Sequence, residues 1–502
     1  MGIDMKKVVI IGGGVAGLTA GIYLQKAGFT TEIYEKHQVA GGQCTGWKRE
    51  GYFIDNCVHW LTGSAKGSAL HDLWKETGVL GDGVELYEKK KFYTSELNGE
   101  SITFWRDKER TRREMLALSP EDEKEINELI AGVALAESMT VPLEKPFDWM
   151  NIKDYIKLGL SMANMGKVMK AYGGIAVTQL AERFRHPLLR QALVDYMPPG
   201  YQAYALVVSY GTVTAGNGDI PKGGSLAMAM RMVHRYEALG GVLHTNTPVK
   251  HIIISGKRAQ GVVLCDHTKI GADCVICACD TSHTFGTLLP RRYMPGQLKK
   301  LYERRDVYPV HSGFQVAFGV EEAFDEAQET TVFSCRPCTV GTRRIERISI
   351  NNYAYESEFS PDGNTILQTN VVQTEEDYRY WERLYQDREA YDRQKKVLAE
   401  ELKERIEERY PALKGKMKVL DVWTPTTYHR YTNAYHGAYM AFCATGKAKN
   451  KTISGRLKGL TNVFLASQWQ MGQGGLPTAA AMGKFASMYV IDHFTIGTGK
   501  NK

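Results

Sequence analysis

A glycine-rich turn close to the N-terminus constrains the fold of this chain more than any other segment. The stretch reads KKVVIIGGGVAGLTAGIYLQKAGFTTEIYEK, and Gly12, Gly14 and Gly17 give it the spacing G-x-G-x-x-G. We expect a buried strand, an amphipathic helix and a second strand within residues 8–34, which together form the first βαβ unit of a Rossmann-type fold. The sequence therefore predicts an α/β protein with a dinucleotide at this turn.

Each glycine of the turn has a physical reason. Gly12 allows the tight turn, Gly14 lets the backbone approach a pyrophosphate, and Gly17 lets the helix pack closely on the strand. The helix N-terminus then offers unpaired N–H groups and its positive dipole end to the phosphates. We expect Val15 and Ala16, at that N-terminus, to contact the cofactor as well.

The residues that follow the second strand indicate which dinucleotide the turn binds. Glu35 stands 18 residues after Gly17, where a carboxylate binds the two hydroxyls of a ribose. The same carboxylate repels a 2′-phosphate, which disfavours NADP. Gly41 and Gly42 come next, in KHQVAGGQCTGW, and a second glycine pair lets the chain return over the pyrophosphate. This continuation favours FAD over NAD.

With its second glycine pair, the sequence resembles the flavoprotein superfamily of amine oxidases and phytoene desaturases. The resemblance implies an FAD cofactor. That family usually has an arginine directly after the glycine pair, whereas this chain has Gln43. The substitution removes one charge-assisted contact to the pyrophosphate. Neutralisation would then depend on backbone N–H groups or on Lys36, Lys48 or Arg49.

Further segments along the chain resemble the same superfamily. GYFIDNCVHWLTG, residues 51–63, is similar to the segment that passes beside the isoalloxazine ring, which implies that His59 borders the flavin; a histidine satisfied in the core is the open alternative. The stretch from Gly218 to Leu264 resembles the middle FAD segment, in which the residue at Val249 contacts adenine through its backbone. Asp280 closes a further predicted strand. These segments, with residues 419–442, are closest to the carotenoid desaturase and isomerase branch.

A second glycine-rich loop lies almost at the C-terminus. SQWQMGQGGLPTAAAMGK predicts a strand end, a glycine turn and then a helix of small residues, with a proline at its start. In the family this helix end faces the pyrimidine ring of the flavin, which implies that Gln468, Gly475, Leu476 and Pro477 contact the cofactor. The FAD site is therefore expected to be split between the two ends of the chain.

The length of 502 residues predicts more than one domain. We expect a discontinuous Rossmann-type FAD-binding domain, a mixed α+β substrate domain and a helical cap or membrane-facing subdomain. The FAD-binding domain is expected at residues 1–90, 215–290 and 440–502. The substrate domain is expected at residues 91–110 and 291–439, and the cap at residues 111–214. Within the substrate domain, a long charged helix is expected at 379–409.

Composition limits the partners. The net charge of +7 is spread along the chain without a block of like charge, so we expect no nucleic acid. Nine scattered cysteines argue against a secreted disulfide framework and favour the cytoplasm. Cys335 with Cys338 is a weak metal candidate, as is the cluster at 274–279, and we expect no metal. The amphipathic stretch 152–174 is expected to pack on the core, with peripheral contact to a membrane as the alternative.

The leading functional prediction is an FAD-dependent oxidoreductase that desaturates or saturates C–C bonds of a polyene, carotenoid-like or other lipid substrate. Tyrosines between residues 196 and 439 suit a long apolar or conjugated ligand, and we name His59 and Tyr435 as candidate catalytic residues. Oxygen, a quinone or another carrier is the expected electron acceptor. Three alternatives stay open: a redox-neutral C=C isomerase, an amine oxidase and a non-catalytic flavin-binding protein.

Overall fold

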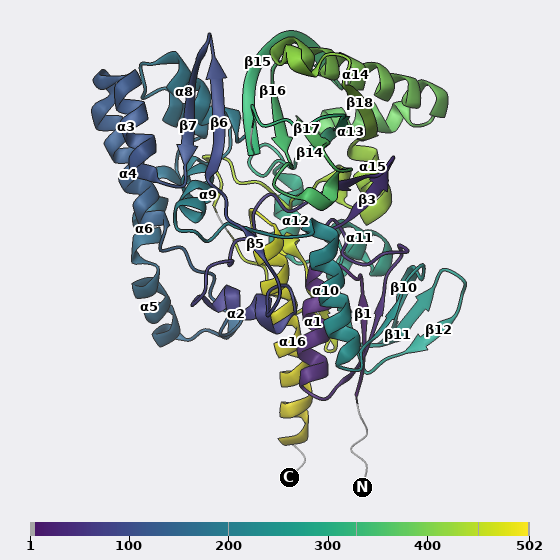
Figure 1. Ribbon diagram of the computed structural model, residues 1–502. Coiled ribbons are helices and arrows are strands. Elements are labelled where there is room, and N and C mark those ends of the chain that lie inside the picture. The colour runs from purple at the N-terminus through teal and green to yellow at the C-terminus, as the bar shows by residue number, and fades with distance from the viewer. Residues whose placement is uncertain (1–5, 199, 328, 450, 500–502) are drawn as a thin grey trace.

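The computed structural model describes residues 6–198, 200–327, 329–449 and 451–499. A five-stranded parallel sheet forms its lower part in Figure 1. The strand order is β19-β13-β1-β2-β9, and every neighbouring pair is parallel. The strands are β1 (Lys7–Ile11), β2 (Thr30–Tyr34), β9 (Val242–His244), β13 (Cys274–Cys277) and β19 (Val463–Leu465). The expected βαβ start of a Rossmann-type sheet is confirmed.

Both ends of the chain contribute to one layer of helices on this sheet. Helices α1 (Val15–Lys26), α10 (Gly224–Ala238) and α16 (Leu476–Gly499) lie side by side and bury their apolar side chains against it (Figure 1). On the other face lies an antiparallel sheet of β10 (Val249–Ser255), β11 (Arg258–Leu264) and β12 (Lys269–Gly271). The first and the last glycine loops therefore approach the same sheet edge.

A seven-stranded mixed sheet forms the upper part of the molecule (Figure 1). In spatial order its strands are β18 (Met417–Trp423), β14 (Ser312–Val320), β17 (Thr365–Gln373), β16 (Arg343–Asn352), β15 (Glu329–Val340), β6 (Lys91–Leu97) and β7 (Glu100–Trp105). Helices α13 (Glu375–Leu384) and α14 (Arg388–Arg409) pack on one face. The prediction of a single helix at 379–409 is wrong. Helix α13 ends at Leu384, and α14 begins at Arg388 with the side chain of Asp387 as its cap.

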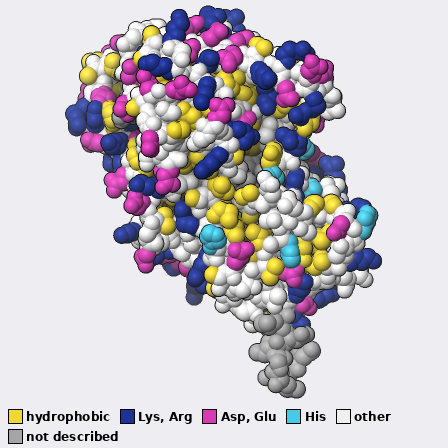
Figure 2. Space-filling model, turned by 45° about the vertical axis from the view of Figure 1, so that its right-hand side comes forward, with side chains coloured by type: hydrophobic (Ala, Val, Ile, Leu, Met, Phe, Trp, Pro, Cys, Tyr) yellow, Lys and Arg dark blue, Asp and Glu magenta, His cyan; other side chains and the backbone are white. Residues whose placement is uncertain are grey.

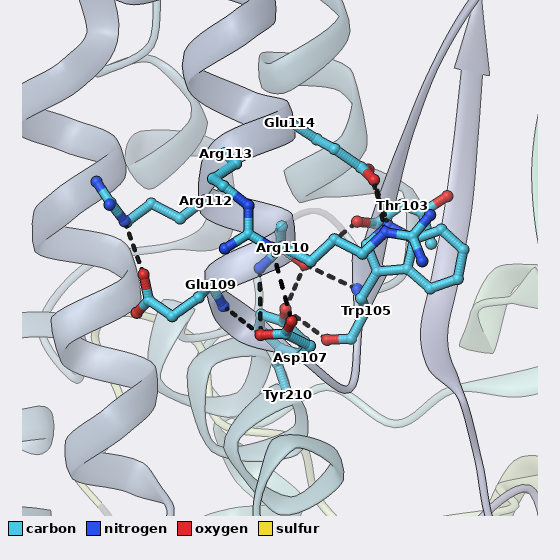
Figure 3. Close-up of polar contacts among 10 residues, drawn as sticks. Thr103, Trp105, Asp107, Glu109, Arg110, Arg112, Arg113, Glu114 and Tyr210 are labelled. Carbon is cyan, nitrogen blue, oxygen red and sulfur yellow. Dashed lines mark hydrogen bonds and ion pairs between the residues drawn. The ribbon is translucent and has the colours of Figure 1, made fainter.

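Seven helices of the described chain lie beside the two sheets and form a cap (Figure 1), and all of them except α5 share a core with β6 and β7. They are α3 (Lys108–Leu118), α4 (Glu123–Ala136), α5 (Ile152–Ser161), α6 (Ala163–Tyr172), α7 (Val177–Ala181), α8 (Pro187–Asp195) and α9 (Ala203–Thr214). Asp107 caps α3 by accepting the N–H groups of Glu109 and Arg110. Figure 3 shows this junction, where Trp105 Nε1 donates to Glu114 and the hydroxyl of Tyr210 donates to the carbonyl of Trp105. The cap is therefore anchored on the end of β7.

Short elements complete the fold. They are the antiparallel pair β3 (Gly46–Arg49) and β4 (Tyr52–Asp55), the pair β5 (Leu86–Tyr87) and β8 (Ile220–Pro221), and the helices α2 (Ala69–Glu76), α11 (Thr281–His283), α12 (Gly296–Glu303) and α15 (Pro425–Thr432). Among the described residues, no helix combines the length and the apolar character needed to cross a membrane. Figure 2 shows acidic and basic side chains interspersed over one face, with hydrophobic side chains gathered in its lower half.

The amphipathic stretch 152–174 divides into two helices with different surroundings. Helix α6 buries Met165, Val168 and Tyr172, as expected of a helix that packs on the core. Helix α5 has no buried residue, and the exposed fractions of Ile152 and Leu160 are 80% and 75%. The expectation of core packing is therefore confirmed for α6 and wrong for α5.

Candidate functional site: a cavity shared by all parts of the fold

One cavity of about 1260 Å³ runs from the glycine turn of β1 to the cap. Most of the residues that the sequence assigns to the cofactor line it: Gly12, Gly14, Val15, Ala16, Glu35, Lys36, Gly42, Gln43, His59, Val249, Asp280, Gln468, Gly475, Leu476 and Pro477. They come from segments up to 465 residues apart in the chain, since Gly12 and Pro477 share the wall. The fold thus brings both glycine loops to one site.

Gly17 is absent from the wall, and its place in the packing explains why. A Cβ atom at Gly17 would lie 2.0 Å from the carbonyl oxygen of Gly12. Gly14 differs, because a Cβ there would meet no atom nearer than 3.9 Å and its backbone is extended with φ −76°. The absence of a side chain at Gly17 therefore lets α1 pack against the turn, whereas its absence at Gly14 leaves space in the cavity.

The carboxylate of Glu35 is oriented by backbone N–H groups. Its Oε2 accepts from Gly13 N at 2.8 Å and its Oε1 accepts from His37 N at 2.8 Å. These bonds tie the end of β2 to the glycine turn of β1 and fix the carboxylate at the cavity wall. Each oxygen keeps further lone pairs, so the group still has acceptors for ribose hydroxyls.

The glycine pair behind Glu35 folds back onto the first glycine turn. Gly41 N donates to Gly13 O at 2.8 Å, and Gly41 and Gly42 both have positive φ. Gln43, which stands where the family has arginine, donates from Nε2 to the carbonyl of Ala438 at 2.9 Å. This side chain therefore joins the loop to the segment after α15.

The late glycine loop is braced by Gln468. The Oε1 of Gln468 accepts the N–H of Gly475 at 2.7 Å, and Gly475 has a φ of +126° that favours glycine. Nearby, Gln473 lines the cavity and its buried Nε2 has no hydrogen-bond partner among the described residues. An unpaired amide donor beside a glycine turn and a helix N-terminus fits the carbonyls and ring nitrogens of a flavin.

The structure shows the contacts of two side chains to which the sequence assigns a role. The ring of Tyr435 packs against Tyr302 and Trp469 and does not line the cavity, so its proposed catalytic role is withdrawn. The backbone N–H of Tyr435 instead donates to Asp280 at 2.8 Å. The ammonium of Lys36 lines the cavity but donates to the carbonyl of Arg430 and to Asn433 Oδ1, so it is already engaged at the C-terminus of α15.

Of the other two cations considered for the pyrophosphate, Arg49 lines the cavity and Lys48 does not. Lys48 is exposed on β3. The guanidinium of Arg49 pairs with Asp421 at 3.0 Å. Backbone N–H groups of the two glycine loops and of the α1 N-terminus are therefore the donors that the structure offers to phosphate.

His59 lies where the cofactor end of the cavity meets the cap. Burial, and then the charge of Lys89, lower the pKa of His59 to about 4, so the imidazole is neutral at pH 7. Lys89 is itself buried and pairs with Glu329, with 3.4 Å between Nζ and Oε2. A neutral imidazole can donate or accept one hydrogen bond at the wall but carries no charge toward a substrate.

Sequence reasoning missed a set of polar contacts that links the cofactor loop to the mixed sheet. Asn56 donates from Nδ2 to the carbonyl of Gln43 at 3.0 Å and accepts at Oδ1 from the hydroxyl of Tyr428 at 3.0 Å. Tyr428 in turn accepts from Gln315 and Trp423. No local pattern marks these side chains, because their partners lie up to 372 residues away.

Asp55, which ends β4, is a second missed residue, and it leaves a local signal. Its oxygens accept from the backbone N–H and the hydroxyl of Ser225, so it caps the start of α10. The Oγ of Ser225 also accepts the N–H groups of Cys57 and Val58. A serine at a predicted helix start is a capping signal that points to such a partner.

Burial raises the pKa of Asp55 to about 6, against an ordinary value near 3.8. The proton is therefore bound more tightly in the folded state, so this group stabilises the fold fully below pH 4 and loses that stabilisation as the pH rises through 6. A shift of two units corresponds to about 3 kcal/mol. We expect the free energy of unfolding of Asp55→Asn, relative to wild type, to rise by about this amount between pH 4 and pH 8.

Urea unfolding of both apoproteins at the two pH values measures this difference. The comparison cancels the titration of all other groups that the two proteins share. A difference that is the same at both pH values would show that Asp55 is ionised in the fold throughout.

A parallel sheet with a glycine turn, a carboxylate at the end of its second strand and a cavity that continues under a cap defines a dinucleotide-binding oxidoreductase. Residues 15–491 match the family model described as flavin containing amine oxidoreductase. The chain belongs to this family, and it is an FAD-dependent oxidoreductase.

Individual relatives are distant. The chain is 25% identical over 467 residues to a phytoene desaturase (lycopene-forming) of a Paracoccus strain, covering 86% of each chain. It is 21% identical to an all-trans-retinol 13,14-reductase of Danio rerio, covering 86% of this chain and 76% of that one. Among solved structures, an oxidoreductase from Methanosarcina mazei shares the fold with a TM-score of 0.60 and 17% identity, covering 97% of this chain and all of that one.

Proposed function

We propose that this protein desaturates or saturates a C–C bond of a long, largely apolar substrate, a polyene or another lipid, and uses FAD as the hydride carrier. The observation that carries the proposal is the single cavity, which joins the glycine turns to a chamber under the cap. Apolar and aromatic side chains of the cap line that chamber: Tyr196, Met197, Tyr201, Ala205 and Val208. Relatives named as a desaturase and as a retinol reductase support chemistry at C–C bonds.

We assign the parts of the fold accordingly. The parallel sheet and its helices bind FAD, the mixed sheet holds the substrate, and the helices α3 to α9 form the cap. The proposed bounds of the FAD-binding part are 1–90, 215–290 and 440–502. Those of the substrate-binding part are 91–110 and 291–439, and those of the cap are 111–214. Residues 1–5 and 500–502 lie outside the described chain. β6 and β7 pair with the substrate sheet but pack on the cap, so they join the two.

FAD supplies hydride transfer when it is bound, and the chain supplies its binding and a dry chamber. We propose that Glu35 binds the ribose, that Val249 lies against the adenine and that the loop from Gln468 to Pro477 holds the flavin ring. His59 borders the reacting end as a neutral imidazole. Oxygen, a quinone or another small carrier is the proposed electron acceptor.

The wall of the chamber that the mixed sheet forms carries polar side chains beside two valines, Val332 and Val372. Alternate residues of neighbouring strands point to it: Gln315 on β14, Thr330 on β15, Ser349 and Asn351 on β16 and Asn370 on β17. The buried Oδ1 of Asn370 has no hydrogen-bond partner among the described residues. A wall of neutral donors and acceptors opposite an apolar cap favours a substrate that carries a neutral polar group on an apolar body.

The charges of the cavity favour this reading over an amine oxidase. An ammonium substrate would be held best by an unpaired carboxylate. The four carboxylates that line the cavity in the described chain all have partners. Glu35 and Asp280 accept backbone N–H groups, Asp195 pairs with Arg347 and Asp421 pairs with Arg49.

The visible spectrum of the FAD-loaded protein tests the proposal. The protein is mixed anaerobically with a hydrocarbon polyene, a hydroxylated polyene and a polyamine in separate experiments. We expect the oxidised flavin bands to bleach with a polyene, faster with the hydroxylated one, and to stay unchanged with the polyamine. For a saturase the same test runs in reverse, with dithionite-reduced protein reoxidised by the polyene.

The other outcomes point elsewhere. Bleaching by the polyamine alone would identify an amine oxidase. A polyene product of unchanged mass, formed only by the reduced protein, would identify an isomerase. Flavin that responds to dithionite and to no organic substrate would indicate a non-catalytic flavin protein.

We further propose that α5 rests on an anionic membrane surface and that the substrate enters from there. Ile152, Ile156 and Leu160 are exposed on this helix, with Lys153 and Lys157 between them. The segment that leads into α5 lines the cavity through Met139 and Val141, and α5 follows at Ile152. Apolar residues flanked by lysines match the acyl boundary and headgroups of an anionic bilayer.

Replacing Ile152, Ile156 and Leu160 together by aspartate is expected to weaken binding to vesicles that contain phosphatidylglycerol by at least about tenfold, since each inserted side chain contributes on the order of 1 kcal/mol. Co-sedimentation measures the bound fraction. Val397→Asp, on exposed α14, is the matched control and should bind as wild type does. Equal binding of the triple variant would contradict the assignment of α5.

A further inference from the structure

Two cysteines lie next to each other at the open end of the β3–β4 hairpin. The register of this hairpin pairs Gly46 with Asp55, and Asn56 N donates to Thr45 O at 3.1 Å, which continues the register by one step. Cys44 and Cys57 are the next residues of the two segments, and both lie in bends just beyond the paired strands. The side chain of Asn56 also donates to the carbonyl of Gln43. Asn56, the neighbour of Cys57, is therefore bonded to the residues on both sides of Cys44.

The surroundings of the two cysteines bring their thiols together. Regular strand pairing ends at Thr45 and Asn56, because the N–H of Thr45 donates to Gln43 O within its own segment. The bonds from Asn56 to Thr45 and Gln43 still hold Cys44 beside the segment of Cys57. The two thiols are in contact, and this contact together with burial raises the pKa of the Cys44 thiol well above its ordinary value. Both cysteines are free in this structure.

The two thiols differ in access. Both line the cofactor cavity. Cys57 is half-buried, whereas only 1% of Cys44 is exposed. A small oxidant that enters the cavity therefore reaches Cys57 first, and Cys44 lies behind it as the thiol that completes the reaction.

We propose that Cys44 and Cys57 form a reversible dithiol–disulfide centre in the wall of the cofactor cavity, with a hydroperoxide as its oxidant. The Cys57 thiol gives its proton to solvent and its sulfur attacks the peroxide, which yields a sulfenic acid and, with hydrogen peroxide, one water. The Cys44 sulfur then attacks the Cys57 sulfur, loses its proton and expels a second water. Two thiols are oxidised by two electrons, and the peroxide is reduced.

The disulfide has a structural consequence for the cofactor site. Cys44 ends the loop whose Gly41 bonds the glycine turn of β1, and Cys57 begins the segment that carries His59. The new bond joins these two parts of the wall covalently. Oxidation therefore restrains the glycine loop over the cofactor, and we expect FAD to leave the oxidised protein more slowly than the reduced one.

The test uses the FAD-loaded wild-type protein and hydrogen peroxide. After mild oxidation, excess peroxide is removed and the free thiols are alkylated under denaturing conditions. We expect two of the nine thiols to be protected, a peptide map that links Cys44 to Cys57, and full recovery of the thiols with dithiothreitol. The peptide map needs no variant, so it stands even if a substitution prevents folding.

Two serine variants supply the controls. Cys265→Ser removes another cavity-lining thiol, which is exposed, and should still form the linkage. Cys57→Ser should form none and should release FAD at the same rate before and after peroxide. The proposal is overturned if all nine thiols remain alkylatable, if Cys57 is oxidised further without a link to Cys44, or if other cysteines become linked.

Discussion

Gly14→Val is expected to abolish FAD binding and to leave the fold intact. A Cβ at Gly14 meets no protein atom nearer than 3.9 Å, and the backbone there is extended, so the apoprotein accommodates a side chain. The same space lies at the cavity wall, where we propose that the pyrophosphate approaches the backbone. We expect the purified variant to lack flavin absorbance, even after incubation with excess FAD, while the thermal midpoint of its apoprotein matches that of wild-type apoprotein.

Gly17→Ala is the contrasting variant. Its Cβ would lie 2.0 Å from the carbonyl oxygen of Gly12, which is backbone of the turn itself, so the turn would have to shift to accept it. We expect this variant to lower the stability of the apoprotein, with loss of FAD only as a consequence. If Gly14→Val retained stoichiometric FAD, the cofactor would take a path other than the one along this turn.

These two glycines show how far the sequence alone reaches. The spacing predicted the turn, the strands on either side of it and the different duties of Gly14 and Gly17, because all of these are local properties of some 30 residues. The family resemblance extended the prediction to Val249 and to the loop at Gly475, and the fold brings both to the same cavity. Their contacts with FAD stay predictions that the spectrum of the loaded protein can test.

The contacts that the sequence did not reveal concern side chains whose partners are far away in the chain. Lys36 follows Glu35 directly and therefore looked available to phosphate, yet its ammonium is engaged by α15, almost 400 residues later. Tyr435 lies in a tyrosine-rich stretch that does line the chamber through Tyr439, but its own ring turns into the core. Along an irregular segment no periodicity tells which of two nearby tyrosines faces the ligand.

The contact that holds the cap to the substrate sheet was equally invisible in the sequence. The carboxylate of Asp195, at the end of α8, pairs with Arg347 of β16, with 2.6 Å between Nε and Oδ1. It also accepts from Ser95 of β6 at 2.6 Å. The side chain of Asp195 is 2% exposed and that of Arg347 16%. Asp195 lines the cavity, so the ion pair stands at the cavity wall through its carboxylate, where cap and sheet meet.

Arg347→Met is expected to destabilise the protein by about 3–5 kcal/mol, because it leaves the carboxylate of Asp195 buried without its counter-charge. Adding Asp195→Asn removes that charge, so the double variant should recover most of the loss. Arg344→Met, which breaks an exposed pair with Glu346 on the same strand, is the matched control and should change stability by less than about 1 kcal/mol.

Urea unfolding of wild type, Arg347→Met, Asp195→Asn and the double variant gives the coupling between the two positions. If the second substitution restores most of the stability, the loss in Arg347→Met comes from the unpaired charge of Asp195. An uncharged junction between cap and sheet is then sufficient for stability. If the double variant is as unstable as the single one, Arg347 contributes through its bonds to the backbone carbonyl of Glu96 and to the hydroxyl of Ser334 instead. The cap would then depend on the arginine itself, and its removal should also raise the rate at which bound FAD exchanges, since the cavity lies directly beneath the junction.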